Sequence, residues 1–287
     1  MKIYREKKAQ YHSPSKGGFK IKEKANLTGY KSLLAFVLCF TVFLLSFLFP
    51  VFQMLYWTII FPKNLIDLNI LQLLLNTLYL VTLSSLVLIV FSFISNYGNR
   101  VTRSKILGLL TTFSISGYAI PGVILAVAFI TFIAWFDNNV ISYFEIKSIK
   151  RIFIGSILGL VLVYFIRFYS LACNGIKSGY EKINRSIDES AYLIGYSKFK
   201  TFFSIHIPYL KNSVFLIGIL VSIEVIKELP ITLILRPFNF ETFATTAYVY
   251  ASQDLLEAAA VPSLFLILIA SFFILITSKY ILREDNE

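Results

Sequence analysis

The sequence predicts an all-α polytopic membrane protein with six transmembrane helices. Hydrophobic residues make up 57% of the 287 residues, charged residues make up 15%, and the mean hydropathy is +0.73. This composition excludes an ordinary soluble globular domain. The apolar residues form continuous runs of the length, about 20 residues, that crosses a bilayer as a helix. Strands of a membrane barrel would be only about 10 residues long and would alternate apolar and polar positions.

Six apolar runs are the candidate spans, and a polar, basic segment precedes them. Residues 1–32 contain nine Lys and Arg residues together with Gly and Ser, a composition that predicts a cytoplasmic tail or linker without fixed structure. The spans form one six-helix domain over 33–282, and 283–287 is a short C-terminal tail. They are expected at 33–57, 71–94, 106–135, 152–172, 213–235 and 261–282.

The third span carries small residues and a proline in its middle. Small side chains permit close contact between helices, and Pro121 removes one backbone hydrogen bond. Two interpretations stay open, close packing with a kink or a position along a translocation pathway. The residues concerned are Ser114, Ser116, Gly117, Pro121 and Gly122.

The net charge of +11 is distributed unevenly between the two sides of the expected membrane topology. Lys and Arg are concentrated before residue 32, at 100–105, at 177–211 and after 278. By the positive-inside rule, both termini and the 177–211 loop face the cytoplasm. Lys147, Lys150 and Arg151 are the exception and are interpreted as anchors to lipid headgroups. Membrane lipid, and not nucleic acid, is therefore the partner that this basic balance predicts.

The 177–211 loop contains a pattern typical of a compact helical knob. A helix is expected to begin near Ser186, whose hydroxyl could cap it, with Glu189 three residues on. Gly195 is expected to interrupt this helix, and a second amphipathic piece is expected to end at Pro208. Such a knob fits a groove on a partner protein, but the residues alone are equally consistent with an ordinary cytoplasmic loop.

Three charged residues lie near the outer end of the fifth span. Glu224, Lys227 and Glu228 are spaced i, i+3 and i+4, which places them on one helical face. Charges inside a membrane are costly and usually face the protein interior or an aqueous cavity. These three form either a mutually neutralising cluster or a gate at the outer mouth of a pathway. Arg167 is expected to extend from the fourth span to the interface.

A motif at fixed spacing lies within the 177–211 loop. It resembles the E-A-A-x-x-x-G-x9-I-x-L-P signature of inner-membrane permease subunits of ABC importers, with Ser190 in place of the first Ala and Ile207 in place of Leu. The resemblance implies the six-helix type I permease fold, and it implies that the loop couples the permease to an ATPase. The matching residues are Glu189, Ser190, Ala191, Gly195, Ile205, Ile207 and Pro208.

Two further segments are similar to the ferric-iron branch of these permeases. Residues 117–123 resemble its third-span motif, and 227–238 resemble its K-E-L-P-x-T-L-x-L-R-P-F signature. The resemblance implies iron(III) as cargo, while polyamine, thiamine or phosphonate import is the alternative. The candidate pathway or gate residues are Tyr118, Pro121, Glu224, Lys227, Glu228 and Arg236. Arg236 and Glu241 are either contacts for a substrate-binding protein or ordinary solvated loop charges.

Members of the iron branch usually have two homologous six-span halves, and this chain resembles only the C-terminal one. It is therefore a half-subunit, a split gene product or a fragment, and a non-transporting remnant is a further alternative. The resemblance implies a second permease half, identical or different, as well as ABC ATPase subunits and a periplasmic or extracellular substrate-binding protein. It places the chain in the bacterial inner (plasma) membrane.

No enzymatic activity or bound cofactor is expected for this chain. It lacks the G-x-x-x-x-G-K-[ST] phosphate loop, so ATP and Mg are expected on the partner ATPase, and no metal ligands are assigned. A second Glu-Ala-Ala sequence, which begins at Glu257, has Ser263 where the signature requires Gly. It is interpreted as an ordinary helix turn on the outer side.

Overall fold

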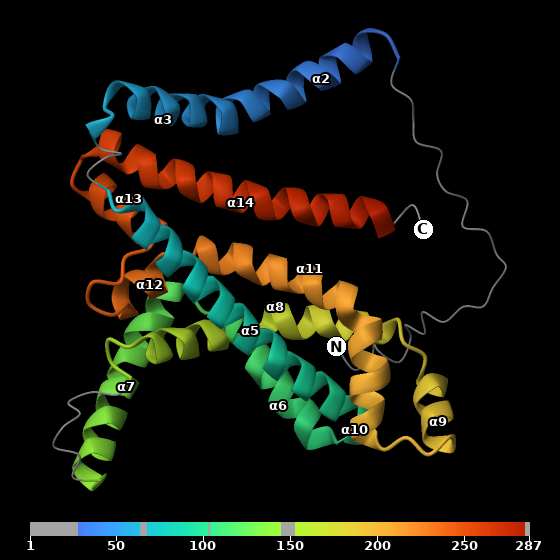
Figure 1. The fold of residues 1–287 in the computed structure, drawn as a ribbon. Coiled ribbons are helices and arrows are strands. Elements are labelled where there is room, and N and C mark those ends of the chain that lie inside the picture. The colour runs from blue at the N-terminus through green and yellow to red at the C-terminus, as the bar shows by residue number, and fades with distance from the viewer. Residues whose placement is uncertain (1–27, 64–67, 103, 145–152, 285–287) are drawn as a thin grey trace. The chain divides into compact units, whose positions relative to one another are not determined.

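The computed structural model describes residues 28–63, 68–102, 104–144 and 153–284 (Figure 1). Lys147, Lys150, Arg151 and most of the predicted N-terminal tail lie outside these residues. Helices account for the regular secondary structure of the described residues, which contain no strand, as the sequence predicts. The chain divides into two compact units, residues 1–50 and 51–287.

The first unit contains the start of an apolar helix. Its described elements are α2 (Tyr30–Phe43), the π-helical turn η1 (Leu44–Leu48) and the first residues of α3 (Phe49–Ile60). None of the α2 and η1 side chains is buried. Since their residues are almost all apolar, this surface is suited to lipid or to another membrane helix.

The second unit is built around three long helices, α5 (Ile70–Thr102), α8 (Ile157–Glu181) and α11 (Ile207–Ile226), which pack against one another (Figure 1). Glycines make the close approach of α8 and α11 possible. A Cβ on Gly175 would lie 2.7 Å from Ile217, and one on Gly179 would lie 2.9 Å from Leu210. The other elements are α6 (Lys105–Ile115), η2 (Ser116–Ala119), α7 (Gly122–Phe144), α9 (Arg185–Leu193), α10 (Lys198–Thr201), η3 (Phe202–His206), α12 (Pro230–Leu235), α13 (Phe243–Ser252) and α14 (Leu256–Glu284).

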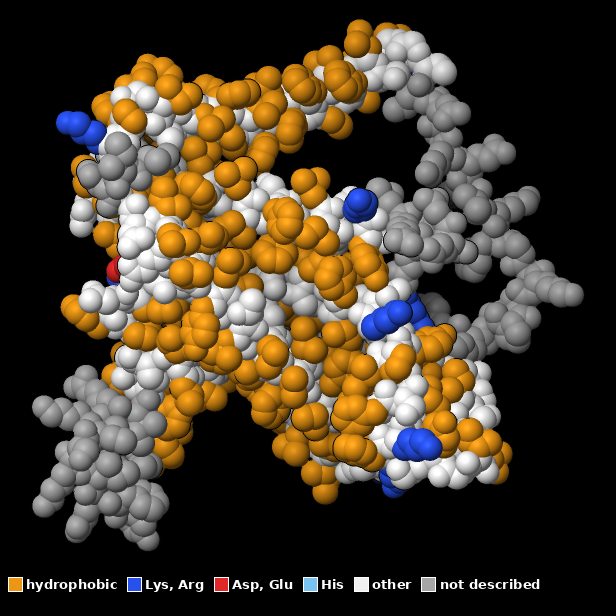
Figure 2. Space-filling model, viewed as in Figure 1, with side chains coloured by type: hydrophobic (Ala, Val, Ile, Leu, Met, Phe, Trp, Pro, Cys, Tyr) orange, Lys and Arg blue, Asp and Glu red, His pale blue; other side chains and the backbone are white. Residues whose placement is uncertain are grey.

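Six helices among the described residues are long and apolar enough to cross a membrane. They are Tyr30–Ile60, Ile70–Thr102, Gly122–Asn139, Ile157–Glu181, Lys198–Ile226 and Leu256–Tyr280. Each overlaps one predicted span. On the face shown in Figure 2, hydrophobic side chains cover the surface over α5, α11 and α14, and Lys and Arg gather near α10. This distribution is typical of a polytopic membrane protein with one basic side.

The third span differs from the prediction. Residues 106–135 do not form one helix, because α6 ends at Ile115, the tight turn η2 follows, and α7 begins only after Pro121. Gly117 lies against α8 so closely that a Cβ there would come within 2.2 Å of the Ile166 carbonyl oxygen. Gly117 therefore serves close packing at a break in the helix, which is sharper than the predicted kink, while Ser114 and Ser116 are exposed.

The fifth span begins earlier and ends earlier than predicted. The helix runs from Lys198 to Ile226, so the expected range 213–235 covers only its second half. Residues 230–235 belong to the separate short helix α12. Apolarity alone marks the lipid-facing part of this helix and misses its polar first turns.

Candidate functional site

The segment between α8 and α11 forms the predicted knob, although most of the 177–211 range is helical. Residues 177–181 complete α8, α9 covers Arg185–Leu193, and α10 begins at Lys198. Asn184, and not Ser186, caps α9, because its side-chain oxygen accepts a hydrogen bond from the Ser186 N–H at 3.3 Å. Short linkers, 182–184 and 194–197, thus attach α9 to the helices on either side.

Gly195 ends α9 as predicted. Its φ of +85° lies in the left-handed region, which favours glycine. The Gly195 N–H donates to the Tyr192 carbonyl at 3.0 Å, and the Tyr196 N–H donates to the Ala191 carbonyl at 2.9 Å. This pair of bonds is the Schellman arrangement, which satisfies the last carbonyls of a helix and turns the chain.

Pro208 does not end a helix, contrary to the prediction. It lies inside the continuous helix Lys198–Ile226, two residues after the π-helical turn η3. Proline has no N–H to donate to the preceding turn, and the wider π turn is a common way for a helix to absorb such a loss. The Lys198 end of this helix is therefore continuous with the rest of the long apolar helix.

The structure brings three of the seven motif residues together and leaves others outward. Ser190, Ala191 and Ile205 line a shallow hollow of about 340 Å³ between α9 and η3. Ala191 is 2% exposed, so it packs the knob against its support. Glu189 is exposed, and the neighbouring Leu193 and Ile194 are 88% and 72% exposed. α9 and the residue that caps its C-terminus, Ile194, therefore present a carboxylate and two large apolar side chains outward.

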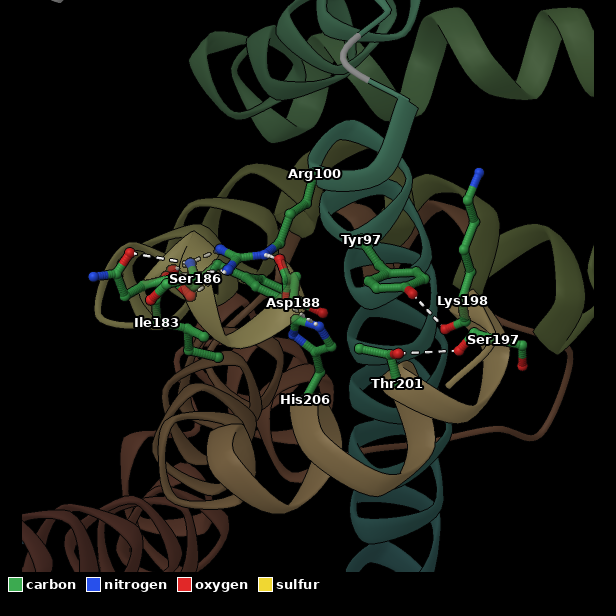
Figure 3. Close-up of polar contacts among 11 residues, drawn as sticks. Tyr97, Arg100, Ile183, Ser186, Asp188, Ser197, Lys198, Thr201 and His206 are labelled. Carbon is green, nitrogen blue, oxygen red and sulfur yellow. Dashed lines mark hydrogen bonds and ion pairs between the residues drawn. The ribbon is translucent and has the colours of Figure 1, made fainter. Parts of the chain in front are cut away.

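An ion pair fastens this knob to α5 (Figure 3). Arg100 Nε lies 2.7 Å from Asp188 Oδ2, and the two side chains are only 11% and 13% exposed. The Arg100 guanidinium also donates to the carbonyl oxygens of Tyr180 at 3.3 Å, Ile183 at 3.1 Å and Asn184 at 3.2 Å. One side chain thus holds the end of α8, the first linker and α9.

The second oxygen of Asp188 faces the long helix that follows. His206 Nε2 lies 3.0 Å from Asp188 Oδ1, and the His206 residue is fully buried. Its ring lies between those of Tyr97 and Tyr180, with centroids 5.2 and 5.4 Å away. We call Arg100, Asp188 and His206 the latch, since the Arg100–Asp188 ion pair joins α5 to α9 and the close Asp188–His206 contact places both against η3.

The predicted charge cluster near the fifth span is divided between two sites. Lys227 Nζ pairs with Glu224 Oε1 at 2.7 Å, which agrees with the neutralising interpretation for these two residues. Glu228 lies two residues beyond the end of α11 at Ile226, outside the helix that carries Glu224. It pairs instead with Arg167 of α8, at 3.3 Å between Nε and Oε2.

Arg167 turns into the protein, contrary to the prediction that it reaches for the interface. It lies near the middle of α8, and its Nη1 donates to the Ile120 carbonyl at 2.6 Å. Glu228 also accepts from the Ile231 N–H at 3.4 Å. A Cβ on Gly122 would lie 2.8 Å from Glu228 Oε1, so the start of α7 fits closely over this pair. The Arg167–Glu228 pair therefore joins α8, the α11–α12 turn and the break before α7.

The remaining pathway candidates, Arg236, Tyr118 and Pro121, are not members of this ion pair. Arg236 pairs with Glu241 and lines a pocket of about 560 Å³ together with Asn69, Gln72 and Tyr250. Tyr118 is 48% exposed on η2, and the Pro121 carbonyl accepts from the Leu125 N–H at the start of α7. The described residues contain no group of three His, Cys, Asp or Glu side chains that could hold a metal ion.

Comparisons with known proteins agree with this architecture. No family model matches the sequence. Two solved structures of bacterial alginate ABC transporters, one of them in complex with an alginate pentasaccharide-bound periplasmic protein, superpose with TM-scores of 0.66 and 0.67 at 17% and 16% identity. Each match covers 86% of this chain, and the matches cover 94% and 92% of the other chains. The chain has the fold of an ABC importer permease.

A curated relative of this permease fold is the Fe(3+)-transport system permease protein FbpB 2 of Haemophilus influenzae. It is 21% identical over 281 residues, which are 97% of this chain and 53% of the relative. The chain spans about half the length of the curated relative it matches. The predicted resemblance to ABC importer permeases, with an iron permease among them, is confirmed.

Sequence reasoning missed the residues that hold the permease knob in place. Arg100 counted only as one of the positive charges that set the topology, and Asp188 was passed over beside Glu189. His206 carried no assigned role. The position of His206 between Ile205 and Ile207, three residues after Phe203, was a possible signal, because a polar ring on an apolar helix face needs a partner.

Proposed function

We propose that this chain is one permease half of an ATP-driven importer and that α9 transmits the movements of an ATPase to the membrane helices. The observation that carries the proposal is the construction of α9. It is a short, capped helix on the basic side of the protein, with Glu189 and Leu193 exposed on it and Ile194 exposed directly after it. Exposed apolar side chains next to a charge are typical of a protein contact site.

The energy for import would come from ATP hydrolysed, with Mg, on ATPase subunits that bind α9. The chain would line half of a translocation pathway, and a second permease half would line the rest. A substrate-binding protein would deliver cargo at the opposite end, where Arg236, Glu241 and the polar pocket lie. The permease fold and the length of the relative support this division of labour.

Ferric ion is the cargo that we propose. The support is the Fe(3+)-transport relative together with the 227–238 segment, which resembles iron permeases. The alginate transporters share the fold at lower identity and support no cargo assignment for this chain. Radiolabelled ferric ion, tested against spermidine and thiamine in cells that lack the chain and in complemented cells, separates these cargoes.

Charge reversal at Glu189 tests the coupling role. We expect Glu189→Lys to reduce ferric uptake to the level of cells without the chain, because the exposed carboxylate becomes a cation at the ATPase contact. Membrane insertion is expected to stay normal. Glu257→Lys is the matched control, since Glu257 belongs to the other Glu-Ala-Ala sequence, at the start of α14. Uptake at the unaltered rate in Glu189→Lys would exclude α9 as the coupling element.

Partner recovery gives an independent measure. The tagged chain, extracted in mild detergent, is expected to retain an ATPase and a second permease half, and Glu189→Lys is expected to lose the ATPase alone. If the unaltered chain comes out without any partner, the importer proposal fails.

A further inference from the structure

The latch connects α9 to α5 and η3, whereas the backbone connects α9 to its neighbours only through two short linkers. α9 is attached covalently through residues 182–184 and 194–197, and such short linkers act as pivots when nothing else holds a helix. Arg100 bridges the first linker, because its guanidinium donates to three carbonyls at or next to that linker. These are the carbonyls of Tyr180, Ile183 and Asn184. Arg100 also reaches α9 itself through Asp188 (Figure 3).

Asp188 also contacts a second long helix. Its two carboxylate oxygens face different elements, Arg100 of α5 and His206 of η3. η3 is part of the continuous helix Lys198–Ile226, whose other end lies next to Glu224 and Lys227. Tyr97 and Tyr180 enclose the His206 ring, so the group has little freedom to rotate away.

We infer that Arg100, Asp188 and His206 are positioning residues that transmit movement of α9 to α5 and α11. The inference rests on the proposed function, because only a coupled permease has a movement to transmit. A force applied to α9 would be absorbed by its two linkers if the latch were absent. With the latch closed, α9 moves as one body with the ends of both spanning helices, since the fork of an arginine fixes orientation as well as distance.

The decisive measurement is the amount of ferric ion taken up per ATP hydrolysed. The complex with its ATPase and second permease half is reconstituted in liposomes with its binding protein and radiolabelled ferric ion. We expect Arg100→Gln to keep the ATPase bound and hydrolysing while uptake per ATP falls about ten-fold or more, within the range of coupling between linked sites. A role in stability alone would lower the amount of complex and leave this ratio unchanged.

Variants define the latch as a unit. Arg100→Lys keeps the charge without the fork and is expected to give an intermediate ratio. Asp188→Asn and the double variant Arg100→Gln/Asp188→Asn are expected to match Arg100→Gln, because residues that act together are not additive. Lys211→Gln, which removes an exposed cation from the same end of α11, is the matched control and is expected to transport normally. A normal ratio in Arg100→Gln would overturn the inference.

Hydrogen exchange of the assembled complex in nanodiscs separates the latch from the proposed function. In Arg100→Gln, the amides of 185–193 are expected to exchange about ten-fold faster, while those of 214–226 stay unchanged. Unchanged exchange in 185–193 would overturn the latch, whatever the transport result. If the unaltered complex hydrolyses no ATP and takes up no iron, the proposed function fails, and faster exchange then still supports the latch as the tether of α9.

Discussion

The turn at the end of α9 depends on the backbone freedom of a single residue. Gly195 has open space around it, since nothing lies within 4 Å of the position where a Cβ would be built. Its φ of +85° is the only obstacle to a larger residue. A substitution at this position therefore introduces backbone strain without steric overlap.

We predict that Gly195→Ala destabilises the α9 turn by about 1–2 kcal/mol, the cost of a left-handed backbone for an L-residue. The amount of folded complex and the uptake of ferric ion should both fall, while Gly195→Asn should retain more of each, because Asn tolerates this conformation better. Gly108→Ala is the matched control. Gly108 also has open space, but it lies inside α6 with an ordinary φ, where Ala is favoured by about 1 kcal/mol. Equal loss in both variants would contradict the strain argument.

Single residues were predictable where a motif or a backbone requirement singled them out. Gly195 and Ala191 have the roles that their types suggest, a turn and a close packing contact. Arg100, Asp188 and Arg167 were not predictable in the same way, because an ion pair joins residues 61 to 88 positions apart, and no local pattern specifies which charges meet. The sequence around Arg167 predicted a side chain at the membrane interface, whereas this side chain binds Glu228 and the Ile120 carbonyl.

At the scale of elements, the contact between η2 and α8 leaves no room for a side chain. Gly117 makes this contact, and the Ile166 carbonyl oxygen occupies the place that a side chain at position 117 would need. The Ile166 carbonyl is backbone, which cannot rotate away as a side chain can. The break between α6 and α7 is held in position by this contact and by the Arg167 bond to Ile120.

We predict that Gly117→Ala separates η2 from α8 and weakens the whole domain, by about 1–3 kcal/mol as for other overpacked sites. The measurement is thermal unfolding of the purified protein in detergent, in a Cys39→Ser background that removes the exposed thiol, followed by the fluorescence of a thiol-reactive dye that reports on the buried Cys173. Gly108→Ala on the adjoining helix again serves as the control. Dye reaction at the unaltered temperature in Gly117→Ala would show that the contact is dispensable.

The six spans were predictable as elements, whereas their ends and breaks were not. Apolar length identifies a spanning helix because the bilayer thickness sets that length. It does not reveal that Pro121 directly precedes the start of a new helix, α7, while Pro208 lies within a continuous one. That difference arises from the surroundings, since the first proline follows a tight turn packed on α8 and the second follows a π turn.

At the scale of the whole molecule, the positive-inside prediction assigns opposite sides to two exposed positions. Phe238 is 93% exposed in the turn between α12 and α13, and Glu181 is exposed at the end of α8. The prediction places the first outside and the second in the cytoplasm. Both termini then face the cytoplasm.

We expect a membrane-impermeant maleimide to label Phe238→Cys in intact cells and to label Glu181→Cys only after permeabilisation. The unaltered chain is the background control, because Cys173 is buried and Cys39 lies in an apolar helix. Labelling of Glu181→Cys in intact cells would reverse the topology and would place α9 on the side that ATP does not reach.

The buried Arg167–Glu228 pair has a consequence for biosynthesis. A helix with an arginine near its centre enters a bilayer at a cost of about 2.5–3.5 kcal/mol. When α8 leaves the ribosome, the Ile120 carbonyl already exists, but the carboxylate of Glu228 has not been made. α8 can therefore reach its final environment only after α11 and the turn behind it have been synthesised. Insertion of the C-terminal helices is expected to proceed as one cooperative step and not span by span.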